Sequence, residues 1–85
     1  LKSRQKLDKY ITQLNYRINE GEGEAIYIIG ITDNGQVVGL NSQILSENIR
    51  ILSYMCRKLD SQITLIIHGI YQNERFLICK IKSKN

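Results

Sequence analysis

The stretch EGEGEAIYIIGITDNGQVVGL, residues 20 to 40, is the most informative part of the sequence about the fold. Its two apolar runs are rich in β-branched residues, and Asn34-Gly35 between them suits the positive dihedral angles of a tight hairpin turn. We therefore predict two antiparallel strands, roughly residues 24 to 32 and 36 to 40. Because the first run has few polar positions, we expect its strand to lie at the centre of a sheet.

Two amphipathic helices are predicted on either side of this stretch. Apolar residues three or four positions apart predict a helix over about residues 4 to 19, and they are Leu7, Tyr10, Ile11, Leu14 and Ile18. A glycine at 21 or 23 is expected to end it. Asn41 is a suitable cap for a second helix, whose apolar spacing continues to about residues 60 to 61.

The remaining segments QITLIIHGIY and RFLICKIK read as strands, with QNE between them as a turn. The predicted order is α-β-β-α-β-β. It favours a single α+β domain over residues 1 to 85, a two-layer sandwich in which two helices cover one face of a four-stranded, mainly antiparallel sheet.

The glycines that precede the first strand invite comparison with a phosphate-binding loop. A dinucleotide fingerprint, G-x-G-x-x-G, follows a strand and opens a helix, whereas Gly21 and Gly23 follow a helix and open a strand. The third glycine position is Ile26, and three glutamates nearby would repel phosphate. The chain also has no G-x-x-x-x-G-K-[ST] motif, so we expect no nucleotide or other cofactor site in it.

The sequence offers little for catalysis or metal binding. His68 is the only histidine and lies in a predicted strand without a nucleophile motif beside it. Cys56 and Cys79 are too few and too far apart for a zinc site, and we interpret both as buried apolar side chains. We predict no catalytic residue and no metal. No apolar run is long enough to span a membrane, so we expect a soluble, cytoplasmic protein without membrane contact.

Charge is segregated along the chain, although the net charge is only +4. Residues 1–19 carry five bases against one acid, residues 20–49 five acids and no base, and residues 50–85 seven bases against two acids. Four of those bases lie on or after the last predicted strand, where they could contact nucleic acid: Arg75, Lys80, Lys82 and Lys84. The alternative is an ordinary solvated surface.

From about residue 7 to residue 81 the chain resembles the N-terminal region of the translational GTPases called GTP-binding proteins one and two, relatives of elongation factor Tu. The most specific matches are Gly21, Gly23, Glu24, Tyr27, Gly30, Gly35, Gly39 and Leu40. One departure is that Ile44, not an acid, stands three residues after Asn41, so no capping box forms.

The resemblance implies a non-catalytic N-terminal accessory domain of a larger GTPase. GTP and Mg²⁺ would then be bound by the rest of the parent chain, which would be this domain's partner, together with RNA or the ribosome. No GTP-site residue of that family lies within these 85 residues.

Two alternatives come from other classes of protein. The hairpin over residues 25 to 40 also looks like the Schlafen-type divergent Alba domain, which implies a free-standing nucleic-acid-binding module. A third interpretation is a protein-interaction module that docks through its sheet, or through Tyr10, Ile11 and Leu14 of the first helix.

Overall fold

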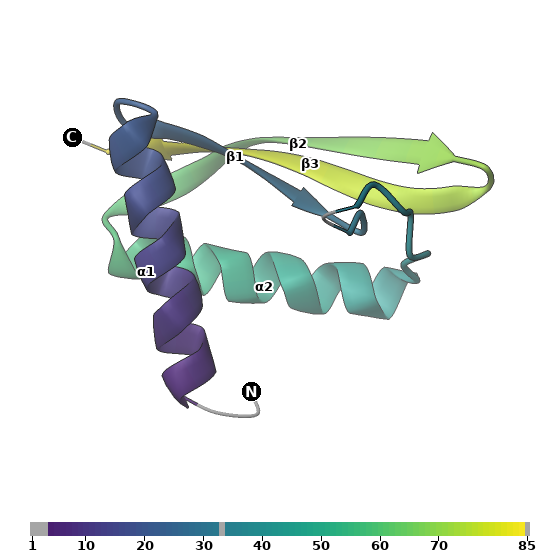
Figure 1. Cartoon of the computed structure of the whole chain (residues 1–85), viewed down its shortest axis with the longest axis horizontal. Helices are drawn as coiled ribbons and strands as arrows, with labels where there is room; N and C mark the ends of the chain where they lie inside the picture. The colour runs from purple at the N-terminus through teal and green to yellow at the C-terminus, as the bar shows by residue number, and fades with distance from the viewer. Residues whose placement is uncertain (1–3, 33, 85) are drawn as a thin grey trace.

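A computed structural model describes residues 4–32 and 34–84 of the chain. Its elements are α1 (Arg4–Glu20), β1 (Glu24–Ile29), α2 (Ser42–Lys58), β2 (Ser61–Tyr71) and β3 (Glu74–Ser83). The two helices run in different directions: α2 lies beneath the sheet, whereas α1 rises from below it until its C-terminal end is level with the strands (Figure 1). The architecture is therefore α+β, in two layers.

The sheet has three strands in the order β1-β3-β2, and both pairings are antiparallel. The prediction of a four-stranded sheet and of the order α-β-β-α-β-β was therefore wrong. The expectation that the first strand is central was wrong as well. β1 is an edge strand, and the last strand, β3, lies between the other two.

The missing strand is the segment over residues 36–40, which begins a hairpin and then leaves it. A turn forms near the predicted place: Gly35 N–H donates to the Thr32 carbonyl at 2.9 Å, and Gly35 has a φ of 87°. Pairing is short: an isolated bridge joins Ile31 and Val37, with one backbone bond on each side of it, from Thr32 N–H to the Gln36 carbonyl at 2.8 Å and from Val38 N–H to the Gly30 carbonyl at 2.9 Å. Gly39 then adopts a φ of 75° and the chain turns towards α2.

The glycine loop after α1 ends the helix, as expected, and has no N–H group left for a phosphate. Gly23 N–H donates to the Ile18 carbonyl at 2.8 Å and Glu22 N–H to the Asn19 carbonyl at 3.2 Å. These two bonds form a Schellman motif, with Glu22 in the left-handed region at φ 55°. Gly21 N–H is also donated to α1, at the Arg17 carbonyl.

The other elements form where the sequence predicts them. Asn41 caps α2 by accepting from Ile44 N–H at 2.9 Å. Gln72 and Asn73 both have positive φ, as the tight turn between β2 and β3 requires. The core between the layers comes from both helices, β1 and β3, and consists of Leu7, Leu14, Ile18, Ala25, Ile29, Leu45, Leu52, Met55, Cys56, Leu77, Cys79 and Ile81.

A β-bulge in β2 decides which of its side chains face the helices. Ile63 pairs with Ile81 on the helix side, but the register shifts at Thr64 and Leu65 pairs with Lys80 on the opposite side. Strict alternation would have placed Leu65 on the helix side with Ile63. After the bulge, Leu65 and Ile67 therefore point away from the helices.

Candidate interaction surfaces

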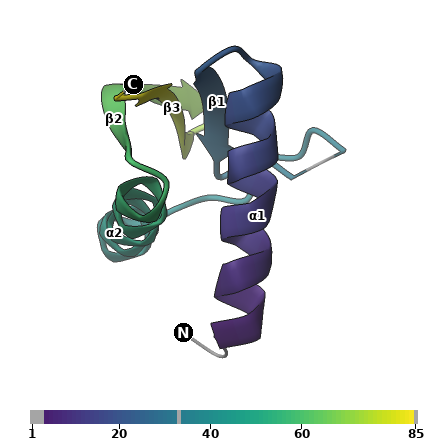
Figure 2. The ribbon, with the colours of Figure 1, turned by 90° about the vertical axis from the view of Figure 1, so that its left-hand side faces the viewer.

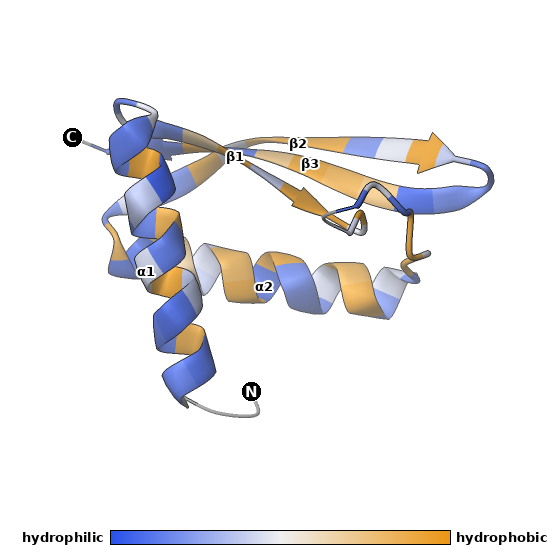
Figure 3. Cartoon of the chain, in the orientation of Figure 1, coloured by the Kyte–Doolittle hydropathy of each residue, from blue (hydrophilic) through white to orange (hydrophobic). Residues whose placement is uncertain are grey.

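The face of the sheet that points away from the helices is apolar over much of its area. Four side chains from the two edge strands are about half exposed on it: Ile26 (58%), Ile28 (48%), Leu65 (51%) and Ile67 (47%). Ile78 of β3 lies between Ile28 and Ile67, and Phe76 follows on the same face beside Gly69; both are partly buried. Apolar residues occupy the middle of the strands in Figure 3. We call these six residues the open face.

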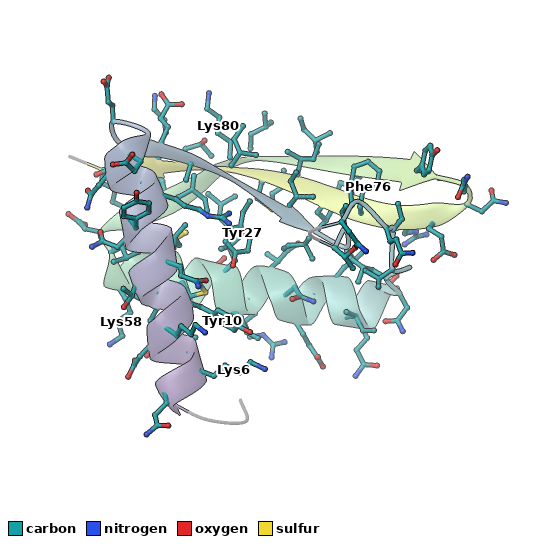
Figure 4. All side chains as sticks on the ribbon, viewed as in Figure 1. Lys6, Tyr10, Tyr27, Lys58, Phe76 and Lys80 are labelled. Carbon is teal, nitrogen blue, oxygen red and sulfur yellow. The ribbon has the colours of Figure 1, made fainter. Side chains whose placement is uncertain are left out.

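One end of the open face is charged. Lys80 and Lys82 both reach Glu24 on β1, with Nζ to carboxylate distances of 3.3 and 3.9 Å. All three side chains are about half exposed, so these ion pairs contribute little to stability. Lys80 and Tyr27 extend to opposite sides of the sheet in Figure 4, with Tyr27 on the side of the helices. Lys80 and Lys82, two of the predicted nucleic-acid contacts, are therefore partly neutralised by Glu24.

The four predicted nucleic-acid contacts do not form one patch. Arg75 lies near the hairpin end of β3, where its guanidinium is 3.5 Å from the Ser42 hydroxyl. Lys80, Lys82 and Lys84 lie towards the other end of the strand or just beyond it. Because a strand rises about 3.3 Å per residue, Arg75 and Lys84 are about 30 Å apart. The structure brings only Lys80 and Lys82 together, on Glu24.

A second cationic surface, which the sequence interpretation missed, lies in a groove of about 1190 Å³ between the two helices. Its residues are Leu7, Asp8, Ile11, Glu47, Arg50, Ile51, Tyr54, Arg57 and Lys58. Six of them, from Glu47 to Lys58, lie on α2. The Lys58 ammonium is 5.5 Å from the Tyr54 ring centroid. Lys58 is labelled on this helix in Figure 4. Helical spacing of Arg50, Tyr54 and Arg57 could have revealed this stripe.

A third surface is a groove of about 890 Å³ between α1 and β1. In Figure 2 the strands β2, β3 and β1 and the C-terminal half of α1 follow one another, so that α1 flanks the outer side of β1. The Arg17 guanidinium lies 5.6 Å from the ring centroid of Tyr27. Burial raises the pKa of Tyr27 above its usual value, and the positive charge of Arg17 partly offsets that rise.

The two cysteines are buried and the histidine lies in a strand, as the sequence predicts. Cys56 and Cys79 are free thiols with 1% and 0% exposure. Burial raises the pKa of Cys56 to about 11, with a contribution from neighbouring Cys79, and burial also raises the pKa of Cys79. His68 is an exposed residue of β2. Across residues 4–32 and 34–84, no three His, Cys, Asp or Glu side chains are grouped as a metal site would require.

The apolar stripe of the first helix is mostly used within the molecule. Leu7, Leu14 and Ile18 are buried, Ile11 packs against the core and only Tyr10 is exposed. Leu14, with 0% exposure, is therefore not accessible to a partner. Neither helix of the described chain has the length and hydrophobicity that a bilayer crossing needs.

These features define a small two-layer α+β domain with an exposed apolar sheet face. Over 64 residues, 75% of its length, the chain is 36% identical to GTP-binding protein 2 of Mus musculus and equally to GTP-binding protein 2 of Homo sapiens. The similarity supports a relation of this segment to a GTP-binding protein family. It spans only 11% of the length of each of these relatives. No protein-family model and no solved structure matches the chain.

Proposed function

We propose that this chain is a non-catalytic accessory domain of a longer, elongation-factor-like GTP-binding protein of the cytoplasm. In this proposal the remainder of the parent chain binds GTP and Mg²⁺. The domain docks on that remainder through its open face. It thereby holds the GTP-binding part in position during translation.

The open face is the observation that carries this proposal. Ile28 and Ile67 expose about half of their surface on either side of Ile78, and Ile26 and Leu65 do so on either side of Lys80. Exposed apolar side chains gathered on one face in this way typically mark a protein-binding surface. The occupant is argued from the relatives, because the matched segment is 11% of their length. The rest of such a parent protein is a much larger polypeptide. It can cover the open face of this segment at an interface between domains.

The test is a binding titration between two purified pieces, the 85-residue chain and the remainder of its parent. We expect a complex, and Ile67→Asp weakens it at least about tenfold, because a buried carboxylate at the centre of the contact loses its hydration. Ile70→Asp is the matched control. Ile70 is 73% exposed on the same strand, but it shares the side of the sheet that faces the helices. It should leave binding unchanged.

Nucleotide titrations complete the test. GTP with Mg²⁺ should bind the parent remainder and leave the amide spectrum of the 85-residue chain unchanged. Specific binding of GTP by the 85-residue chain would contradict the proposal, as would equal effects of Ile67→Asp and Ile70→Asp.

A second candidate function, RNA binding, is favoured by the cationic stripe of α2. Arg50, Arg57 and Lys58 line one groove with Tyr54, and they outnumber the two carboxylates there, Asp8 and Glu47. Basic side chains beside an aromatic ring suit phosphates and a stacked nucleobase. Lys80 and Lys82 are weaker candidates for RNA contacts because both of their ammonium groups pair with the Glu24 carboxylate. Labelled single-stranded RNA should bind more weakly as salt rises. Arg57→Gln should reduce that binding more than Lys82→Gln, and no binding at low salt would remove this candidate.

A further inference from the structure

The outer edge of β1 exposes backbone groups that are not used within the sheet. Ser83 N–H donates to the Gly23 carbonyl at 2.8 Å, so the backbone of Gly23 faces β3. In an antiparallel ladder the residues whose backbone faces the partner alternate along the strand. The backbone N–H and C=O groups of Ala25, Tyr27 and Ile29 therefore point towards β3. Those of Ile26 and Ile28 point outwards, away from the sheet.

The segment after the hairpin turn confirms this alternation from the other side. Gly30 has the same parity as Ile28, and its carbonyl accepts from Val38 N–H on the outer side of β1. The pairing stops there because Gly39 turns the chain away. Among the described residues, no backbone hydrogen bond reaches the outward groups of Ile26 or Ile28. Two donors and two acceptors are left in line at this edge.

These backbone groups lie beside the groove between α1 and β1. Ile26 and Ile28 line one wall of this groove, which has a volume of about 890 Å³. The opposite wall is α1, whose Thr12, Tyr16 and Arg17 contribute to it (Figure 2). A strand added to β1 would lie about 4.8 Å from it, on the side where α1 runs.

Among the described residues that line the groove, Arg17 is the one that carries a charge. Within the described residues the guanidinium of Arg17 has no ion pair, and its contact is the face of the Tyr27 ring. Stacking on a ring leaves the in-plane N–H donors of a guanidinium available for a carboxylate. The groove is therefore complementary to an acidic ligand.

We propose that the outer edge of β1 binds an extended acidic peptide segment, which adds to the sheet as a fourth strand and places a carboxylate against Arg17. Backbone bonds to Ile26 and Ile28 supply affinity in this mode, and the carboxylate supplies selectivity. The site shares Ile26 and Ile28 with the open face but uses their outward backbone groups, whereas the docking contact proposed above is tested at Ile67 on β2, the other edge strand. The two proposals can therefore fail separately.

The probe is a synthetic peptide that alternates valine and glutamate, titrated into the ¹⁵N-labelled 85-residue chain. We expect the amide signals of Ile26 and Ile28 to shift most. The same peptide with lysine in place of glutamate should bind about tenfold more weakly. Arg17→Gln should remove that difference by weakening the glutamate peptide, while an unchanged circular dichroism spectrum shows that the fold is retained.

A proline scan separates this edge from the other edge of the sheet. Ile28→Pro removes an outward N–H of β1 without breaking a bond to β3, and it should abolish peptide binding. His68→Pro is the matched control. The Lys84 N–H bond to the Asp60 carbonyl shows that the backbone of the even-numbered residues of β3 faces β2. Beyond the bulge His68 pairs with the odd-numbered Leu77, so its N–H points out of the sheet. It should leave binding intact. Equal binding of the glutamate and lysine peptides would overturn the proposal, and so would the largest shifts occurring on β2.

Discussion

The guanidinium of Arg17 lies over the ring of Tyr27, 5.6 Å from its centroid, and so connects α1 to the edge strand β1. A cation–π contact at a half-buried ring contributes about 1 kcal/mol. Because Tyr27 faces the helices, the contact holds the C-terminal half of α1 beside β1. It thereby shapes the groove in which β1 presents its unused backbone groups.

Gly30 should tolerate no side chain. Its φ is 100°, and an added Cβ would lie 2.7 Å from Leu40 Cδ1 and 3.1 Å from the Arg75 carbonyl oxygen. We expect Gly30→Ala to lower the free energy of unfolding by about 2–3 kcal/mol in urea denaturation. Gly35→Ala is the control, because Gly35 also has a positive φ, 87°, but an added Cβ there meets no atom within 4 Å. An equal loss of stability in both variants would show that the close contact with Leu40 does not add to the destabilisation.

The two faces of the sheet should respond differently to substitution in the isolated chain. Leu77 of β3 has 0% exposure between the sheet and the helices, so Leu77→Ala should cost about 3 kcal/mol of stability. Ile67→Thr on the open face keeps a β-branched side chain and should change stability by less than about 1 kcal/mol. Urea denaturation measures both. A large loss for Ile67→Thr would mean that the open face is covered in the isolated chain.

The N-terminus of α2 depends on the Asn41 side chain. It accepts from Ile44 N–H at 2.9 Å, and no capping box assists it because residue 44 is not an acid. Asn41→Ala should therefore destabilise the fold by about 1 kcal/mol. Asn48→Ala is the control, since Asn48 donates only to the Ile44 carbonyl inside the helix, at 2.8 Å, and alanine favours helix there. Thermal melts that rank the two variants in the opposite order would contradict this account of the cap.

Stability should decrease in alkaline solution through the buried thiol of Cys56. Its pKa rises from 9.0 to about 11 on folding because burial disfavours the thiolate. The unfolded chain therefore loses this proton first, so the stabilisation is complete below the unfolded pKa and is lost as pH rises through the folded one. The loss is on the order of 2 kcal/mol.

Urea denaturation at several pH values between about 8 and 10.5 measures this effect. Cys56→Ala should flatten the dependence, while the raised pKa values of Cys79 and Tyr27 leave a residual slope of the same sign. A wild-type stability that is constant over this range would contradict the burial-based explanation.

The sequence predicts both helices and β3 because the apolar periodicity of each matches the face that it buries, and it predicts β2 because that run is rich in β-branched residues. It fails where tertiary geometry overrides a local pattern. A turn forms at Gly35, but Gly39 turns residues 36–40 away from β1. β1, predicted to be central, is therefore an edge strand. Periodicity does not show which strand a later segment will join, and β3 takes the central place by pairing on both sides.

The surfaces were predictable only in part. Lys80 and Lys82 share a face as their alternation implies, but their ion pairs with Glu24 depend on a register between distant strands. The open face depends on the bulge at Thr64, which reverses the side on which Leu65 and Ile67 lie. A one-residue irregularity of this kind leaves no clear signal in a run of β-branched residues.

The most direct test of the central claim, that the open face is covered by the rest of a GTP-binding parent, is the rate of thiol labelling at Ile67→Cys. The native thiols Cys56 and Cys79 are buried, so labelling of the isolated folded chain reports the introduced cysteine. We predict rapid labelling of Ile67→Cys in the isolated chain and strong protection in the full-length parent, read from the labelled peptide by mass spectrometry. Ile70→Cys should react rapidly in both. Equally rapid labelling of Ile67→Cys in the parent would contradict the account.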